Sequence, residues 1–359
     1  MQVAKHRIEL RRSHPGRESK LKTTWTFGTG YAVDVDQLYV SASADVYEAY
    51  APFTALYNWS PELADGAPNS EWRYRFVDWH ASSVTTFIPA DGDDWWLCAL
   101  SEEGHVLFTG AGLAPEKVPD AGVFSEGAAG YGYLSDLQQI GEHLYAAGYS
   151  GQVYKRTGPG RWHHMDQGIL QPAGMQGGQY SIQVINGSAE DDIYVAGCTN
   201  APYYPVRASH WNGSEWRDIA LPEVAERITN IHVESKDRIW LCGSNGTLLL
   251  GNARDGFRSL STVDDNQLFF SITLFEGRAY LGSNLGLFMY DPANATAGIR
   301  PVVTGLEPEL QDANVVDSVE GVLWSIGPKD IARFDGQSWS RIHHPDNPPI
   351  GAPSGGATP

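Results

Sequence analysis

Two short segments pair histidine with aspartate, a combination that can bind a metal ion. They read HHMD from His163 and HHPD from His343. A zinc site places three or four ligands around one ion, and neighbouring residues of a strand point to opposite sides of it. Neither segment supplies a complete site by itself. We expect these histidines to lie at exposed edges of the fold, and the sequence predicts no metal ion.

The three cysteines do not have the spacing of a metal or redox site. Cys98 and Cys242 each follow a tryptophan by two residues, and Cys198 lies in a similar apolar run. A small apolar side chain suits a packed position of this kind. The sequence also lacks a phosphate-binding glycine loop with its lysine, a nucleophile elbow and a zinc-protease helix. We expect the cysteines to lie in the core, and the sequence predicts no cofactor.

Carboxylates could serve an enzyme that acts on a saccharide, since such enzymes use a pair of acidic side chains. The candidates in predicted surface connections are Asp65, Glu71, Glu126 and Asp136. No motif draws them together, so a hydrolase or lyase is the alternative and not the main expectation. A separate acidic turn with Asp91, Asp93 and Asp94 offers calcium ligands. That turn lacks the bidentate glutamate of a calcium-binding loop.

The charge of the chain is strongly negative and unevenly distributed. The 359 residues carry a net charge of −18, although residues 1–23 hold seven Lys or Arg against two Glu. The remaining residues therefore carry 18 basic and 41 acidic side chains, a net charge of −23. Such a surface repels nucleic acid and anionic membranes and attracts a basic partner. Solubility alone is the other explanation of this acidity.

Targeting signals are missing from the sequence as well. The N-terminal residues contain no apolar segment of a secretory signal, and the chain has no apolar run of the length that spans a membrane. We expect a cytoplasmic protein that binds neither nucleic acid nor membrane.

A pattern like EDDIYVAG (190–197) recurs along the chain: a polar turn, an aromatic residue, then a small residue. The aromatic residues are Tyr39, Trp96, Tyr145, Tyr194, Trp240, Tyr280 and Trp324, at separations of 57, 49, 49, 46, 40 and 44 residues. Alternating apolar segments flank most copies on both sides, and tight Asn-Gly and Asp-Gly turns join some of them. Repeats of 40–50 residues with about four strands each are typical of propeller blades.

The repeat predicts an all-β fold, a seven-bladed β-propeller of four-stranded antiparallel blades. One four-stranded sheet cannot bury both of its faces, whereas seven sheets around an axis bury each aromatic residue against a neighbour. Six or eight blades remain open because the first two units are long. We place the propeller at residues 24–345, after a basic arm or edge strand (1–23) and before a disordered Pro/Gly-rich tail (346–359).

On this blade pattern the chain resembles bacterial WD40/YVTN/BNR-like propeller repeat proteins. The Trp-Asp ending of WD40 units, the BNR box and the paired glycines of kelch units are absent. Propellers of this kind occur as partners of secreted toxins. The resemblance therefore implies a non-enzymatic binding protein, one version of which is an immunity protein that covers a basic toxin domain. A scaffold or assembly factor and a sensor of a small ligand are the alternatives of the same kind.

The surplus residues fall in connections of blades 1–4, which we expect to share one face. They are rich in aromatic residues and glycine, the composition of an adaptable protein-binding surface. The predicted partner-binding residues are Phe53, Tyr57, Phe124, Tyr131, Tyr133, Met175, Tyr180, Tyr203 and Tyr204. Plugging of the channel mouth by the same side chains is the other interpretation.

Overall fold

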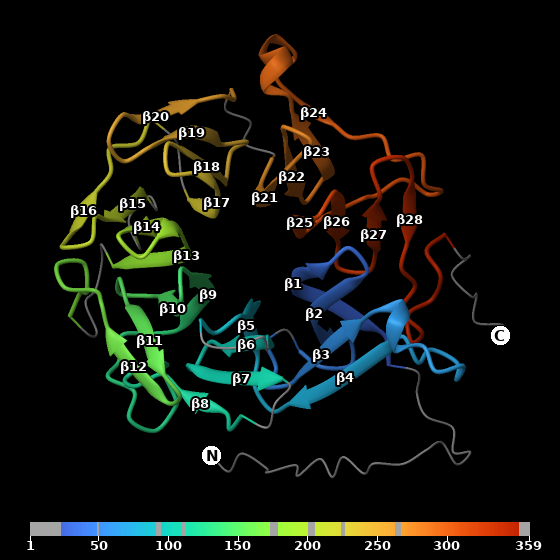
Figure 1. Cartoon of the computed structure of the whole chain (residues 1–359), viewed down its shortest axis with the longest axis horizontal. Coiled ribbons are helices and arrows are strands. Elements are labelled where there is room, and N and C mark those ends of the chain that lie inside the picture. The colour runs from blue at the N-terminus through green and yellow to red at the C-terminus, as the bar shows by residue number, and fades with distance from the viewer. Residues whose placement is uncertain are drawn as a thin grey trace.

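Each copy of the repeated pattern forms the second strand of a four-stranded antiparallel sheet. The computed structural model describes residues 23–48, 50–90, 95–109, 113–172, 179–199, 205–223, 227–262 and 267–351. Seven such sheets stand around a central axis (Figure 1), and the four strands of each are consecutive in the sequence. The predicted seven-bladed propeller is confirmed. Within the described residues, no helix has the length and apolar character needed to span a membrane.

The first four blades contain the shortest and the longest strands. Blade 1 is β1 (Trp25–Asp34), β2 (Gln37–Ala44), β3 (Thr54–Trp59) and β4 (Trp72–Val77). Blade 2 is β5 (Ala81–Phe87), β6 (Trp96–Ser101), β7 (His105–Thr109) and β8 (Glu116–Lys117). Blade 3 is β9 (Leu134–Ile140), β10 (His143–Gly148), β11 (Val153–Gly158) and β12 (Arg161–His164). Blade 4 is β13 (Tyr180–Ala189), β14 (Asp192–Thr199), β15 (Val206–Trp211) and β16 (Trp216–Asp218).

The last three blades repeat the same order. Blade 5 is β17 (Ile228–Ser235), β18 (Arg238–Gly243), β19 (Leu248–Asn252) and β20 (Gly256–Ser259). Blade 6 is β21 (Phe269–Phe275), β22 (Arg278–Ser283), β23 (Gly286–Tyr290) and β24 (Ile299–Pro301). Blade 7 is β25 (Val315–Val319), β26 (Val322–Ile326), β27 (Ile331–Phe334) and β28 (Trp339–Arg341). Two short 3-10 helices, η1 (Pro61–Leu63) and η2 (Pro292–Ala297), lie in connections.

The second-strand aromatic residues pack between the blades, as the repeat predicts. Tyr39 of blade 1 lies in an apolar cluster with residues of blade 2, and Trp240 of blade 5 lies in one with residues of blade 6. Seven clusters of this kind occupy the seven boundaries between neighbouring blades. Trp96 is the least buried of the seven aromatic residues, since it begins its strand. Burial of these large side chains provides the main stabilisation of the ring.

Blades 1 and 7 close the ring by packing and hydrogen bonds, because neither blade borrows a strand from the other. Trp324 of β26 meets Trp59 of β3 edge to face, with ring centroids 5.7 Å apart. The Asp317 carboxylate of β25 accepts a hydrogen bond from the Ala32 backbone N–H of β1 at 2.9 Å. Arg333 of β27 forms an ion pair with Asp36 at 2.8 Å. The seam therefore depends on side chains from both ends of the propeller.

Residues 343–347, which we call the C-terminal clasp, extend this closure beyond blade 7. Asn347 accepts a hydrogen bond from the Trp25 backbone N–H at 2.7 Å, and the His343 carbonyl accepts one from the Trp72 indole at 3.1 Å. The His344 ring lies 4.5 Å from the Tyr57 ring and 4.8 Å from the Trp72 ring. Two predictions are corrected: His344 is buried and not at an exposed edge, and the start of the predicted tail packs on blade 1.

The clasp is expected to weaken in mildly acidic solution. Burial lowers the pKa of His344 from 6.5 to about 4, against the opposing effect of Asp346. The unfolded chain therefore binds this proton at a higher pH than the folded chain, so stability falls as the pH drops from about 6.5 towards 4. His344→Phe keeps a ring but removes the titration. Between about pH 7 and pH 4.5 the free energy of unfolding should fall less in the variant than in the parent protein, by about 2 kcal/mol.

Urea unfolding of parent and variant across this pH range measures the difference. Any contribution of His232, whose pKa burial also lowers to about 4, cancels in the comparison. Identical pH dependence of the two proteins would rule out this role of His344.

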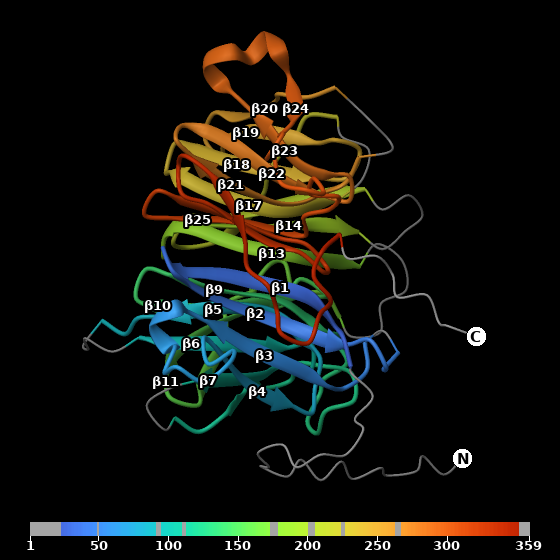
Figure 2. The same cartoon turned by 90° about the vertical axis from the view of Figure 1, so that its right-hand side faces the viewer.

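The antiparallel order of the strands sorts the connections onto two rims. The first rim carries the connections between the second and third strands of each blade and those from one blade to the next. The second rim carries the other hairpins. Figure 2 shows the ring from the side, with the arrow of β4 pointing to the first rim on the right. The innermost strands of all seven blades line a central channel of about 490 Å³.

Candidate functional site

The long connections gather on the first rim, but less exclusively than the sequence predicts. Residues 45–53 join β2 to β3, and residues 118–133 join β8 to β9. By the order of the strands, both lie on the first rim, as do residues 165–172 after β12. Residues 173–178 and 200–204 are outside the described residues. The prediction that the long connections of blades 1–4 share one face is wrong for the β3–β4 connection, residues 60–71. This connection lies on the second rim and contains η1. Two-residue β8 interrupts the long stretch between β7 and β9.

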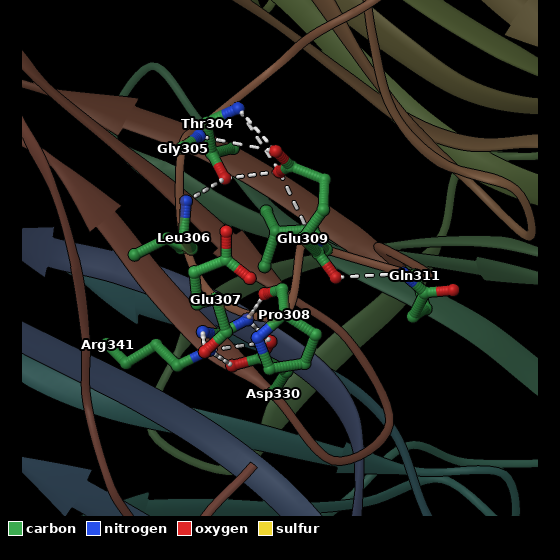
Figure 3. A network of polar contacts seen from close by, with 10 residues as sticks. Thr304, Gly305, Leu306, Glu307, Pro308, Glu309, Gln311, Asp330 and Arg341 are labelled. Carbon is green, nitrogen blue, oxygen red and sulfur yellow. Dashed lines mark hydrogen bonds and ion pairs between the residues drawn. The ribbon is translucent and has the colours of Figure 1, made fainter. Parts of the chain in front are cut away.

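A further long connection lies on the first rim outside blades 1–4. It joins β24 to β25, and its loop is held by its own side chains (Figure 3). The Glu309 carboxylate accepts hydrogen bonds from the backbone N–H groups of Thr304 and Gly305, and Arg341 donates to the Glu307 carbonyl at 3.1 Å. Arg341 also pairs with Asp330 of the neighbouring connection at 2.9 Å. The first rim therefore has ordered connections on both sides of the channel.

The predicted partner-binding residues differ widely in exposure. Phe124 is 84% exposed, while Phe53, Tyr131 and Tyr133 are half-buried. The Tyr133 ring lies 6.2 Å from that of Tyr149. Three further predicted residues are outside the described residues: Met175, Tyr203 and Tyr204. The acidic turn at residues 91–94 and the basic N-terminal arm up to residue 22 are outside them as well.

Tyr57 and Tyr180 are corrected from surface residues to core residues. Tyr57 lies in β3, not in a loop, and its ring packs against Trp25 and Trp72. Tyr180 begins β13, donates a hydrogen bond to the Val195 carbonyl at 3.2 Å, and is fully buried. Burial raises the pKa of both hydroxyl groups. Neither ring is available to a partner without unfolding of its blade.

The β2–β3 connection exposes apolar residues that are not among the predicted partner-binding residues. Val46, Tyr47 and Tyr50 are all exposed, and Tyr50 is 74% exposed. Tyr50 has a φ of +63°, a conformation that a bulky residue adopts only under constraint. Its ring lies 5.3 Å from that of His80, which in turn is 3.4 Å from the Glu102 carboxylate. The segment DVYEAYAPF itself, with two tyrosines beside small residues, is the signal that could have identified them.

The β8–β9 connection is held still by side chains of blade 2. One oxygen of Glu103 accepts three hydrogen bonds, from the backbone N–H groups of Val123, Phe124 and Ser125 at 2.8–3.0 Å. Burial alone would raise the pKa of Glu103, but these N–H groups lower it below its usual value. The Lys117 ammonium donates to the carbonyls of Glu103 and Ala121. The loop that carries Phe124 is therefore rigid on account of bonds at its base.

The charged residues within the rim connections of blades 1 and 2 are all acidic, although Lys117, Lys329 and Arg75 lie beside them. Four first-rim connections of blades 1 and 2, at 45–53, 78–80, 102–104 and 118–133, contain no Lys or Arg. Their acidic residues are Asp45, Glu48, Asp78, Glu102, Glu103, Asp120 and Glu126. Glu48, Asp78, Asp120 and Glu126 are exposed. A surface of this kind attracts a cationic partner and repels an anionic one.

Two hollows adjoin the same connections. A groove of about 1000 Å³ lies between blades 1 and 2, with Tyr47, Phe53 and Trp79 among its lining residues. A smaller pocket of about 320 Å³ opens where the innermost strands reach the first rim, beside His80, Glu102 and Tyr133. Aromatic walls beside exposed carboxylates are the chemistry of a protein-recognition surface.

The structure does not bring together the carboxylates that an enzyme would need. Asp65 and Glu71 lie on the second rim, whereas Glu126 lies on the first. Asp136 lies in β9, where its carboxylate accepts hydrogen bonds from Ser83 of blade 2 and the Ile185 N–H of blade 4. It is buried, and burial raises its pKa. Asp136 therefore links three blades, and the four candidates form no pair.

The histidines and cysteines considered in the sequence analysis make contacts that support the fold. His164 bridges Asp166 at 2.9 Å and Asp120 at 3.5 Å, so it ties the β8–β9 connection to blade 3. The second histidine pair belongs to the C-terminal clasp, on another blade. Cys98, Cys198 and Cys242 are buried in second strands, as expected. Across the described part of the chain, no three His, Cys, Asp or Glu side chains are placed to hold a metal ion.

Comparison with known proteins gives one relative in sequence and many in fold. The chain is 28% identical to Immune protein Tsi7 of Pseudomonas aeruginosa over 244 residues, 68% of this chain and 74% of that protein. No protein-family model matches it. The WD40 β-propeller domain of Doa1 is similar in structure, with a TM-score of 0.56 at 11% identity over 87% of this chain and 92% of that one. The computationally designed Ika8 protein has a TM-score of 0.54 at 12% identity, over 90% and 87% of the two chains.

Proposed function

We propose that this chain is a cytoplasmic immunity protein that neutralises a toxin by binding a basic domain of it and covering its working surface. The observation that carries the proposal is the similarity to Immune protein Tsi7, which extends over about two thirds of the chain. The likeness to WD40 and designed propellers supports only the fold. The net charge of −18 favours a basic partner.

Neutralisation by binding fits the physical character of the first rim. Exposed aromatic side chains, a loop fixed by hydrogen bonds and acidic rim connections favour association with another protein over catalysis. In this proposal the propeller acts as a rigid support, because its core clusters fix the positions of the rim connections. Inhibition of the toxin then needs no chemical step.

The test is co-expression with the product of the gene next to the one that encodes this chain, since an immunity protein is encoded beside its toxin. Cells that express the neighbouring gene alone should stop growing, and co-expression of this chain should restore growth. The two proteins should also be purified together as a complex. A neighbouring product that arrests growth whether or not this chain is present would contradict the proposal, and so would a product that never binds it.

A further inference from the structure

The first rim of blades 1 and 2 carries two exposed aromatic anchors on separate connections. Phe124 is 84% exposed at the β8–β9 connection, and Tyr50 is 74% exposed at the β2–β3 connection. Exposure of most of an aromatic ring to water is unfavourable, so exposed aromatic residues commonly mark protein interfaces. Contacts join the two connections: Tyr50 meets His80, His80 faces Glu102, and neighbouring Glu103 holds the Phe124 loop.

The Phe124 loop is preorganised for binding. Glu103 accepts the N–H groups of three successive residues, and the Gly122 N–H bonds the Gly132 carbonyl at 3.1 Å across the loop. A Cβ at Gly122, whose φ is +98°, would lie 2.3 Å from a Glu103 carboxylate oxygen. A loop fixed before binding loses little conformational entropy when a partner docks. The backbone that carries the exposed ring is therefore fixed before a partner docks.

The surroundings specify the chemistry of the partner. The connections around both anchors contain seven carboxylates and no Lys or Arg. The aromatic groove of about 1000 Å³ between blades 1 and 2 can accept an apolar side chain. We propose that Phe124 and Tyr50 are the anchors of a docking site for a segment of the toxin that presents apolar side chains flanked by Lys or Arg. This inference rests on the proposed function and assigns it to the first rim of blades 1 and 2.

The experiment measures the affinity of the purified chain for the neighbouring gene's product, used in an inactivated form. Phe124→Ala should weaken binding about 30-fold or more, as expected for an interface anchor. The pair Asp78→Lys and Glu126→Lys should weaken it by at least about 30-fold, because cationic groups then face each other. The parent's affinity should also fall steeply as salt is raised, since exposed charges are screened.

Matched controls lie on the same protein. Val303 is as exposed as Phe124 (83%) and lies on the first rim near blade 7, so Val303→Ala should leave affinity within about twofold. Glu62→Lys with Asp65→Lys reverses two charges on the second rim and should have a similarly small effect. All these positions are exposed, so the variants should remain folded.

The outcomes separate the two proposals. If the parent binds and the Phe124 and Asp78/Glu126 variants bind equally well, this docking site is wrong while the immunity function stands. If the parent itself does not bind the neighbouring product, the proposed function fails, and the docking site fails with it. Loss of affinity only in the blade 1 and 2 variants supports both.

Discussion

Arg156→Ala should lower the free energy of unfolding by about 3–5 kcal/mol. Arg156 of β11 forms a bidentate pair with Glu116 of β8, at 2.9 and 2.7 Å, and both side chains are almost fully buried. The Trp162 indole donates to the same carboxylate at 2.9 Å, and the guanidinium lies 4.8 Å from the Phe108 ring. Removal of the arginine leaves a buried carboxylate without its counter-charge. Urea unfolding at neutral pH measures the loss.

The double variant Arg156→Met with Glu116→Met is the control for this prediction. Two apolar side chains fill the same space without an unpaired charge, so the double variant should be more stable than Arg156→Ala. Because Glu116 lies in β8, at the base of the Phe124 loop, Arg156→Ala should also weaken partner binding. A loss of stability below about 1 kcal/mol would show that the pair is not needed to join blades 2 and 3.

Trp324→Ala should destabilise the protein by a similar amount, about 3–5 kcal/mol, by opening the seam between blades 7 and 1. Trp324 is completely buried, and its ring meets Trp59 across the seam. No strand is shared between the two blades, so the cavity falls where packing, side-chain bonds and the backbone hydrogen bond from the Phe27 N–H to the Pro328 carbonyl close the propeller. Trp324→Phe should recover most of the loss, because the indole N–H has no hydrogen-bond partner in the described part of the chain.

Trp95 provides the matched control for the seam prediction. Its side chain is 43% exposed on the second rim, so Trp95→Ala should change stability by no more than about 0.5 kcal/mol. Thermal or urea unfolding of the three tryptophan variants makes the comparison. Equal losses for Trp324→Ala and Trp95→Ala would contradict the role assigned to the seam.

The repeated pattern was sufficient to predict the fold because it encodes a local and a global requirement at once. A polar turn and an aromatic residue, as in Glu190 to Gly197, specify a hairpin strand and supply the ring that packs on the next blade. The same pattern could not place strand ends. Tyr57 was expected in a loop because it falls among the surplus residues of blade 1, yet residues 54–59 pair with both β2 and β4 as the third strand of the sheet.

The remaining errors concern residues whose roles depend on distant parts of the chain. The clasp pairs Asn347 with Trp25, 322 residues away, and no local pattern indicates that contact. Glu103 is an ordinary turn residue in the sequence, and its role becomes visible only when the Phe124 loop folds over it. Two-residue β8 is too short to show any periodicity, although Glu116 bonds Arg156 of blade 3 and Lys117 bonds the Ala121 carbonyl in the Phe124 loop.

Hydrogen exchange of the chain with and without the neighbouring gene's product would test the central claim most directly. We predict slower exchange of backbone amides in the connections at 45–53 and 118–133 in the complex. The β3–β4 connection on the second rim, residues 60–71, should exchange at the same rate with and without the partner. Slower exchange on the second rim, with no change at 118–133, would contradict the account.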